Sequence, residues 1–223
     1  MDLATAKDHI RSTVDANRHR LIEVSHDLWE HPELCFEEHR AHDLLTAELE
    51  AAGFEVERGA FGLDTAFRAR AGSPSATGPS VGIVLEYDAL PVVGHACGHN
   101  IIAAAGLGAA IAAAEVVERF DARLVVYGTP AEEGGAGKVH MIDRGAFRDV
   151  DVAMMVHPAD VDLNAFWAIA IQELHVDYHG RAAHAAAAAH LGLNALDAAV
   201  LGYMNVAALR QHIAGNERVH GIF

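Results

Sequence analysis

The sequence predicts an α/β fold, in which helices cover both faces of a parallel or mixed sheet. Three short apolar runs have the character of buried strands: "VGIVL" (81–85), "RLVVYG" (123–128) and "VAMMV" (152–156). Helical patterns at 101–118 and 138–147 lie between them. Apolar strands that alternate with helices are typical of a sheet buried on both faces.

Two helices and a short strand are predicted before this alternating pattern. The first 30 residues have a helical pattern, and a second helix runs from about 37 to 52 and ends at a glycine. The segment "FEVER" (54–58) alternates in polarity and predicts a short strand.

The pattern breaks near residue 166, and we predict a domain boundary there. Residues 1–166 are expected to form one domain, and residues 167–223 an incomplete second domain. Within the second domain, 167–180 alternates like a long strand, and a helix runs from about 194 to 213. The segment 218–223 resembles the start of another strand.

Composition argues against several classes of partner. The formal net charge is −15, and nucleic acids and anionic membranes both need clustered positive charge, so we expect neither as a partner. The apolar run at 101–114 is too short to span a bilayer, and no apolar signal segment opens the sequence. With only two cysteines, Cys35 and Cys97, we predict a cytoplasmic protein with reduced thiols. Of the 16 histidines, those outside the motifs, such as His42, are expected on the surface.

Chemically reactive side chains directly follow the three predicted strands. Glu86 and Asp88 follow the first strand, Glu132 and Glu133 follow the second, and His157 follows the third. In open α/β sheets, ligands bind beyond the carboxyl ends of the strands. We therefore expect these side chains to converge at one edge of the sheet, although they are far apart in the sequence.

The motif "GHACGHN" (94–100) opens the helix after the first strand and places Cys97 between His95 and His99. Three interpretations compete: a metal site, a nucleophilic cysteine, and an ordinary turn with two surface histidines. Cysteine, histidine and carboxylate together suit zinc or a similar divalent ion. Of two adjacent glutamates, one can bind metal while the other takes a proton from water. The convergence favours the metal site, whereas a nucleophilic cysteine lacks an evident third group.

Several motifs, in order along the chain, resemble those of the M-twenty metallopeptidase family. They are "YDALP", "GHACGHN", "GTPAEEGGAGK", "MIDRGAF", "VHP" and "HGRAAHAAAA" with the following "NALDAAV". The N-terminal "LWEHPELCFEEHRAHDLLTAELEAAGFEV" is similar too, so the resemblance covers nearly the whole chain. The chain most resembles the amidohydrolase branch, near aminobenzoyl-glutamate hydrolases and acyl-amino-acid or dipeptide hydrolases.

The resemblance implies a zinc-peptidase-like catalytic domain with an inserted α+β lid that also dimerises. It implies two divalent metal ions, zinc or manganese, with Cys97 bridging them. His99, Glu133 and His157 would be further metal ligands, and Glu132 would be the general base.

The resemblance also assigns roles outside the metal ligands. Asp88 would hold a ligand in orientation, and His184 of the lid would reach a partner subunit's active site and polarise the scissile carbonyl. His95 matches the motif without being a ligand. Asn100 stands where much of the branch has Asp, which favours the aminobenzoyl-glutamate-like side. In the family a catalytic half resumes after the lid and supplies another histidine ligand, so we expect this chain to be truncated.

The sequence therefore predicts an enzyme, a metal-dependent hydrolase that cleaves an amide bond of an N-acyl or N-aroyl amino acid or dipeptide. Its expected partners are a small-molecule amide substrate and a second copy of the chain, which dimerises through the lid. Two alternatives remain open: a catalytically incomplete metal-binding or dimerisation fragment, and a cysteine-nucleophile amidase. Sensitivity to a chelator separates the metal enzyme from the thiol enzyme.

Overall fold

The computed structural model describes residues 1–164, 168 and 170–223. The chain divides into two compact units, Met1–Leu163 and Asn164–Phe223. The boundary predicted between residues 166 and 167 lies outside the described residues, so its place stays a prediction. Each unit is described by itself.

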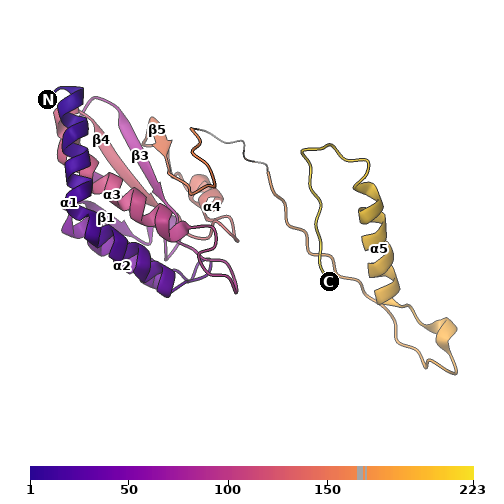
Figure 1. Ribbon diagram of the computed structural model, residues 1–223. Helices are drawn as coiled ribbons and strands as arrows, with labels where there is room; N and C mark the ends of the chain where they lie inside the picture. Colours follow the sequence, from indigo (N-terminus) through magenta and orange to yellow (C-terminus); the bar gives the residue numbers. More distant parts are fainter. Residues whose placement is uncertain (165–167, 169) are drawn as a thin grey trace. The chain divides into compact units, whose positions relative to one another are not determined.

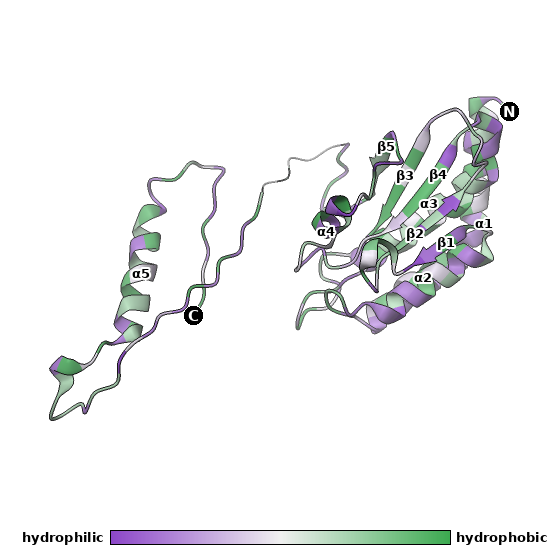
Figure 2. Cartoon of the chain, turned by 180° about the vertical axis from the view of Figure 1, so that it is seen from behind, coloured by the Kyte–Doolittle hydropathy of each residue, from purple (hydrophilic) through white to green (hydrophobic). Residues whose placement is uncertain are grey.

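A five-stranded mixed sheet forms the centre of the first unit (Figure 1). In spatial order its strands are β1 (Glu55–Arg58), β2 (Phe67–Ala71), β4 (Arg123–Gly128), β3 (Ser80–Leu85) and β5 (Val152–Met154). β3 runs parallel to β4 and β5, whereas β2 is antiparallel to both β1 and β4. The central strands β3 and β4 are the most apolar (Figure 2), as expected for strands covered on both faces.

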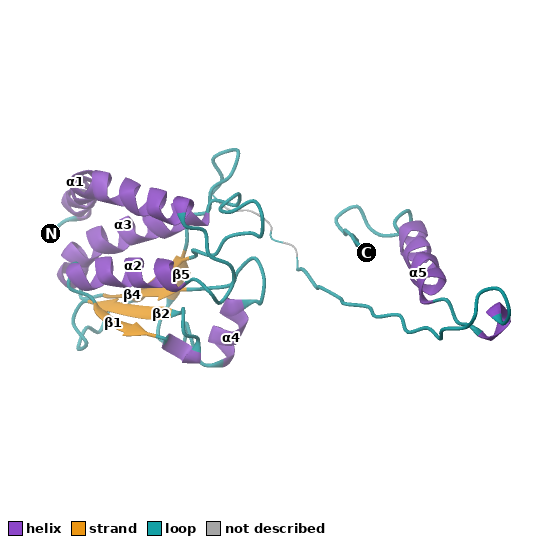
Figure 3. Cartoon of the chain, turned by 90° about the horizontal axis from the view of Figure 1, so that it is seen from below, coloured by secondary structure: helices purple, strands orange, loops and turns teal. Residues whose placement is uncertain are grey.

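The helices of the first unit's main layer are α1 (Leu3–Glu30), α2 (His39–Ala51) and α3 (His99–Val117) (Figure 3). α2 and α3 lie against one face of the sheet, and α1 packs against α3. Their apolar side chains, such as Leu45 of α2 and Leu107 of α3, pack with the strands into the main hydrophobic core. Short 3-10 turns follow β1 and α3, at Ala60–Gly62 and Glu118–Phe120.

A smaller apolar cluster lies on the other face of the sheet. There Met141 of α4 (Gly137–Asp143) packs with Val125 and Tyr127 of β4. The prediction of a mixed sheet with helices on both faces is therefore confirmed, although the second face carries only this short helix within residues 1–163.

α3 is the most apolar helix of the first unit and packs closely on α1. A Cβ added at Gly108 would lie 2.6 Å from Leu21 Cδ1, so a larger residue there would displace the Leu21 side chain. Asn100 at the start of α3 donates hydrogen bonds to the carbonyl and hydroxyl oxygens of Ser25 on α1. Residues 99–120 are long and apolar enough to cross a membrane by composition, with a mean hydropathy of 1.8. Because 56% of that segment is buried inside the protein, it also fits the description of a core helix.

Most predicted elements of the first unit are present, and the differences have local causes. β2 escapes prediction because Arg68 and Arg70 alternate with only two inward apolar residues, too short a pattern to distinguish from a loop. The helix predicted over 138–147 ends at Asp143, where turns begin and Gly145 adopts a φ of 96°. His42, expected on the surface, is buried instead, since its ring packs edge-on against Phe67.

The second unit contains α5 (Ala195–Leu209), close to the helix predicted over 194–213, and a 3-10 turn at Ala189–Leu191. The strand predicted over 167–180 lies partly outside the described residues, and 170–180 is not a strand. The segment 218–223 is not a strand either. A strand needs a hydrogen-bonding neighbour, and the only pairing described in this unit is the single bridge between Arg181 and Leu193.

Candidate metal centre

The two acidic segments meet because β3 and β4 are neighbouring parallel strands. Leu85 and Gly128, the last residues of the two strands, are register partners. The chain therefore leaves both strands at the same edge of the sheet, with Glu86 and Asp88 after β3 and the loop to Glu132 after β4. This is the edge at which open α/β sheets bind ligands.

His99, the first residue of α3, lies at the centre of the acidic side chains. It is 1% exposed, and its Nδ1 lies 2.9 Å from Asp88 Oδ1. The other oxygen of Asp88 accepts a hydrogen bond from the backbone N–H of Glu133 at 2.9 Å. His99 Nε2 faces three carboxylates, with distances of 3.5 Å to Glu86, 3.6 Å to Glu133 and 3.8 Å to Glu132. Asp88 thus fixes the ring so that Nε2 points at the carboxylates.

Two atoms at the centre of this cluster are buried without a hydrogen-bond partner in the described part of the chain. They are His99 Nε2 and Glu86 Oε2. Buried polar atoms nearly always have a hydrogen-bond partner in folded proteins, so two neighbouring buried atoms without one need an explanation. Two sets of possible ligand atoms lie within 4.8 Å of one another: Glu86 with His99 and His157, and His99 with Glu132 and Glu133. Imidazole and carboxylate donors at this spacing fit a divalent metal ion.

The pKa shifts at the cluster show that its local field is negative. Burial lowers the pKa of His99, but the hydrogen bond to Asp88 and the nearby carboxylates outweigh burial and raise it. Burial and the charge of Glu86 raise the pKa of Glu132. A hydrogen bond to Glu133, followed by burial, raises the pKa of Cys97 to about 11. In each case the nearby carboxylates contribute in the direction expected of negative charge, because they raise the pKa.

A glycine in the loop before α3 packs closely against the segment that follows β5. Gly98 has a φ of 79°, and a Cβ added there would lie 2.9 Å from Pro158 Cγ, so only glycine fits this close approach. The rings of His99 and His157 are consequently 6.1 Å apart and nearly perpendicular, at 88°. His157 thereby joins the cluster from the segment after β5.

Most of the predicted site residues of the first unit come together here. Asp88, His99, Glu132, Glu133 and His157 all belong to this cluster. Cys97 lies outside both sets of possible ligand atoms, although its thiol hydrogen-bonds Glu133. The individual roles of these residues stay predictions.

Three further residues named in the sequence analysis are His184, His95 and Glu86. His184 belongs to the second unit, where its Nδ1 accepts a hydrogen bond from Ala187 N at 3.1 Å, and its predicted role remains a prediction. His95 is buried and lies outside both sets of ligand atoms. Glu86 is predicted at this edge without a role of its own; it is 2% exposed and pairs with Lys138. Its position directly after a buried strand is the signal that points to it.

A hollow of about 1410 Å³ lies away from this cluster and is lined by, among others, Ser80, Arg123 and Asp151 at the opposite ends of the strands. None of the predicted site residues lines it. The chemistry of the side chains, and not the size of a hollow, therefore identifies the candidate site.

Comparisons with known proteins agree with this centre. Residues 86–217 match the model of peptidase family M20/M25/M40. The chain is 44% identical to the Xaa-Arg dipeptidase of Mus musculus, over 99% of this chain and 54% of that protein. It is 36% identical to one subunit of the p-aminobenzoyl-glutamate hydrolase of Escherichia coli, over 95% of this chain and 47% of that protein.

A solved structure shows the same fold. The Bacillus subtilis YXEP protein, a dinuclear metal binding peptidase, matches with a TM-score of 0.57 and 27% identity, over 62% of this chain and 42% of that one. The chain spans about half the length of the curated relatives it matches. Since the family model covers more than half of the 223 residues, the chain belongs to peptidase family M20/M25/M40.

Proposed function

We propose that this protein is a metal-dependent hydrolase that cleaves an amide bond of an N-acyl or N-aroyl amino acid or a dipeptide. The observation that carries the proposal is the group of imidazole and carboxylate donor atoms around His99, in which His99 Nε2 and Glu86 Oε2 are buried without a hydrogen-bond partner among the described residues. Membership of a metallopeptidase family supports the same conclusion.

The side chains divide into those that hold the ions and those that act on the reactants. His99, Glu133, His157 and Cys97 would hold two divalent ions, zinc or manganese. The ions would supply Lewis acidity, which lowers the pKa of water and polarises the carbonyl. Glu132 accepts the proton of the attacking water and passes it to the departing amine.

The accessibility and electrostatics of Glu132 suit that role. Its side chain is 44% exposed, whereas that of Glu133 is 18% exposed and hydrogen-bonds Cys97. The pKa of Glu132 is raised by burial and by Glu86, and a carboxylate with a raised pKa is a stronger base toward water.

The substrate class follows from what the named relatives share. The Xaa-Arg dipeptidase, the p-aminobenzoyl-glutamate hydrolase and the N-acetyl-L-cysteine deacetylase of Bacillus subtilis are all named for amides of an amino acid. We therefore expect an acyl or aminoacyl group on one side of the scissile bond and a free amino-acid carboxylate on the other.

The test is hydrolysis of a small panel with and without a metal chelator. The panel contains dipeptides that end in arginine, p-aminobenzoyl-glutamate and N-acetyl amino acids. Activity should disappear after chelation and return with added zinc or manganese. Activity that survives chelation and is lost in Cys97→Ser would instead support the cysteine-nucleophile amidase. The raised pKa of Cys97 argues against that rival, since nucleophilic cysteines have lowered pKa values.

The proposal extends to a homodimer in which His184 completes the partner's site by polarising the scissile carbonyl. Mixing an inactive His184→Ala protein with an inactive Glu132→Gln protein should then restore part of the activity, because one site of the mixed dimer has both residues. No recovery, despite demonstrated exchange of subunits, would show that His184 does not act across the interface.

A further inference from the structure

We propose that Glu38 is a positioning residue of the metal centre: its buried carboxylate holds the turn at Ala131 and thereby places Glu132 and Glu133. The proposal rests on the proposed function, because it presumes that these two glutamates serve a metal site. Glu38 lies just before α2, 93 residues from Ala131 in the sequence.

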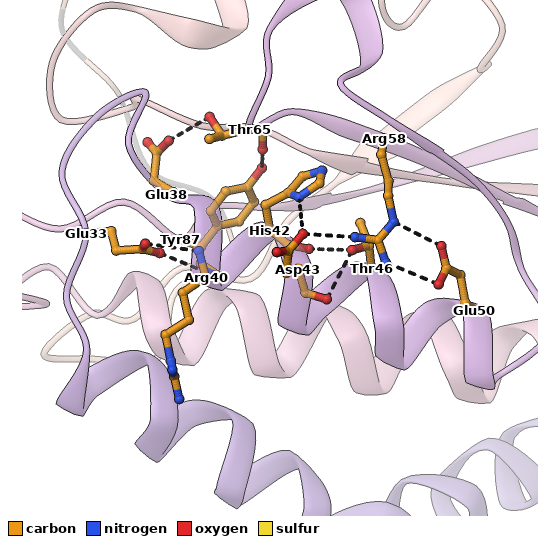
Figure 4. Close-up of polar contacts among 11 residues, drawn as sticks. Glu33, Glu38, Arg40, His42, Asp43, Thr46, Glu50, Arg58, Thr65 and Tyr87 are labelled. Carbon is orange, nitrogen blue, oxygen red and sulfur yellow. Dashed lines mark hydrogen bonds and ion pairs between the residues drawn. The ribbon is translucent and has the colours of Figure 1, made fainter.

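The Glu38 carboxylate is fully buried, and each of its oxygens accepts a hydrogen bond. Oε1 accepts from the backbone N–H of Ala131 at 2.8 Å, and Oε2 accepts from the hydroxyl of Thr65 at 2.8 Å. The carbonyl of Thr65 in turn accepts from the hydroxyl of Tyr87 at 2.6 Å. Figure 4 shows the side chains of Glu38 and Tyr87 converging on Thr65.

The backbone at Ala131 needs this support. Ala131 has a φ of 56°, in the left-handed region that residues other than glycine seldom adopt, and it is fully buried. Such a conformation persists only where the surroundings hold it. The carbonyl of Ala131 accepts from Gly137 N at 3.0 Å, and its N–H donates to Glu38. Without the Glu38 carboxylate, that N–H would be buried without a partner, one residue before Glu132.

The same network reaches the other acidic segment. Tyr87 stands between Glu86 and Asp88, is fully buried, and stacks on Phe67 with ring centroids 5.9 Å apart. The hydrogen bonds from Tyr87 to Thr65 and from Thr65 to Glu38 therefore tie the segment after β3 to the loop after β4. Glu38 thus fixes the spacing between the two groups of carboxylates that face His99.

If Glu38 only stabilised the fold, its replacement would leave the metal affinity of the folded protein unchanged. If Glu38 positions the ligands, its replacement should weaken metal binding even in a folded variant. Glu38 belongs to neither set of possible ligand atoms, so its charge is not needed to bind the ion directly. Its proposed contribution is to hold the turn at Ala131 in the conformation that places Glu132 and Glu133. Glutamine keeps an acceptor for Ala131 N–H, and its amide can donate to the Thr65 hydroxyl. Aspartate keeps the charge but is one methylene too short to reach both partners.

The experiment is a Co²⁺ titration of the metal-free 223-residue chain, followed by calorimetry and by the visible absorption of bound Co²⁺. Glu38→Ala should weaken Co²⁺ binding by about 10- to 100-fold, the usual effect of removing a group that orients metal ligands. Glu38→Gln should bind nearly as tightly as the wild type, and Glu38→Asp more weakly than Glu38→Gln. Each variant is checked by circular dichroism.

Glu33→Ala is the matched control. The Glu33 carboxylate also accepts backbone hydrogen bonds nearby, from Arg40 and Ala41 at the start of α2, but no hydrogen bond joins it to Ala131. The Glu33→Ala variant should therefore have the same Co²⁺ affinity and the same spectrum of bound Co²⁺ as the wild type.

Three outcomes in the variants would overturn the proposal. One is a folded Glu38→Ala variant with wild-type affinity and spectrum, and another is an equal loss in Glu33→Ala. If Glu38→Ala does not fold, the order of the other two variants decides, and tighter binding by Glu38→Asp than by Glu38→Gln would contradict the role of geometry. A wild-type chain that binds no Co²⁺ refutes both this inference and the proposed function, whereas wild-type binding with an unresponsive Glu38 series refutes the inference alone.

Discussion

Two of the carboxylate clusters in the first unit differ in what neutralises them. The surface cluster consists of Asp43, Glu50 and Arg58, in which the guanidinium lies 3.0 Å from Asp43 and 3.1 Å from Glu50. The strand-end cluster consists of four carboxylates and two imidazoles, which belong to Glu86, Asp88, Glu132, Glu133, His99 and His157. One arginine pairs with two carboxylates at the surface. At the strand ends, two histidines and Lys138, which pairs with Glu86, lie among four carboxylates.

Burial makes this difference meaningful. The carboxylates of the surface cluster are 74% (Asp43) and 48% (Glu50) exposed, so water solvates them and their ion pairs contribute little to stability. Glu86 and Asp88 are at most 2% exposed, and burying carboxylates is costly unless positive partners are present. A cluster that keeps buried negative charge without enough protein cations is therefore better explained by a bound divalent ion than by stability.

The largest expected effect separates the two adjacent glutamates of the strand-end cluster. Glu132→Gln should retain metal and lose about 10²- to 10⁴-fold in turnover, because it would remove the proposed general base. Glu133→Gln should lose metal first, with activity falling as a consequence. Metal content and turnover, measured side by side on the natural protein, test this. If Glu132→Gln empties the site and Glu133→Gln does not, the two roles are reversed.

Asp88→Asn should have the next largest effect. The side chain keeps its shape, but the carboxylate that holds His99 Nδ1 and accepts from Glu133 N is lost. Metal affinity should fall by about 10- to 100-fold. Asp43→Asn is the matched change in the surface cluster and should leave the affinity unaltered. Equal affinities of the two variants in a Zn²⁺ competition titration would remove Asp88 from the metal site.

Cys97 should show an intermediate effect, visible in its reactivity. Since its pKa is raised to about 11, the thiolate fraction of the metal-free protein should be small at neutral pH and rise toward pH 11. In a Cys35→Ser background, iodoacetamide labelling should follow that pH dependence. Glu133→Gln should speed labelling several-fold at pH 8, because it removes the largest cause of the raised pKa. A labelling rate already maximal near neutral pH would support a nucleophilic cysteine instead.

The smallest effect is expected from the surface cluster itself. Arg58→Ala removes the shared guanidinium, and exposed ion pairs of this kind are worth at most about 1 kcal/mol. The free energy of unfolding in urea should fall by no more than that, while the metal affinity stays unchanged. A loss of metal binding in Arg58→Ala would mean that the two clusters do not have the separate roles described above.

The sequence predicted the elements that carry a strong local pattern. The apolar runs at β3, β4 and β5 identified the parallel strands, and reading just beyond them located Glu86, Asp88, Glu132, Glu133 and His157. β2 has too short a pattern to be recognised alone. Its residue Phe67 gives His42 a buried packing partner, so the position of that histidine could not be predicted without the strand.

The role of Glu38 has no local signal at all. In the sequence it is one of two adjacent glutamates at the start of an amphipathic helix. Its importance comes from Thr65 and Ala131, which lie 27 and 93 residues away, and from the left-handed backbone of Ala131. Contacts of this range depend on the completed sheet, so periodicity and spacing could not have identified them.

A Zn²⁺ titration of the metal-free chain would show whether the strand-end cluster is a divalent metal site. Calorimetry in two buffers of different ionisation enthalpy would give the affinity and the number of protons released. We expect tight Zn²⁺ binding with release of protons, including that of the Cys97 thiol, and a large loss of affinity in His99→Ala. Absence of binding, or binding that His99→Ala leaves unchanged, would contradict this expectation.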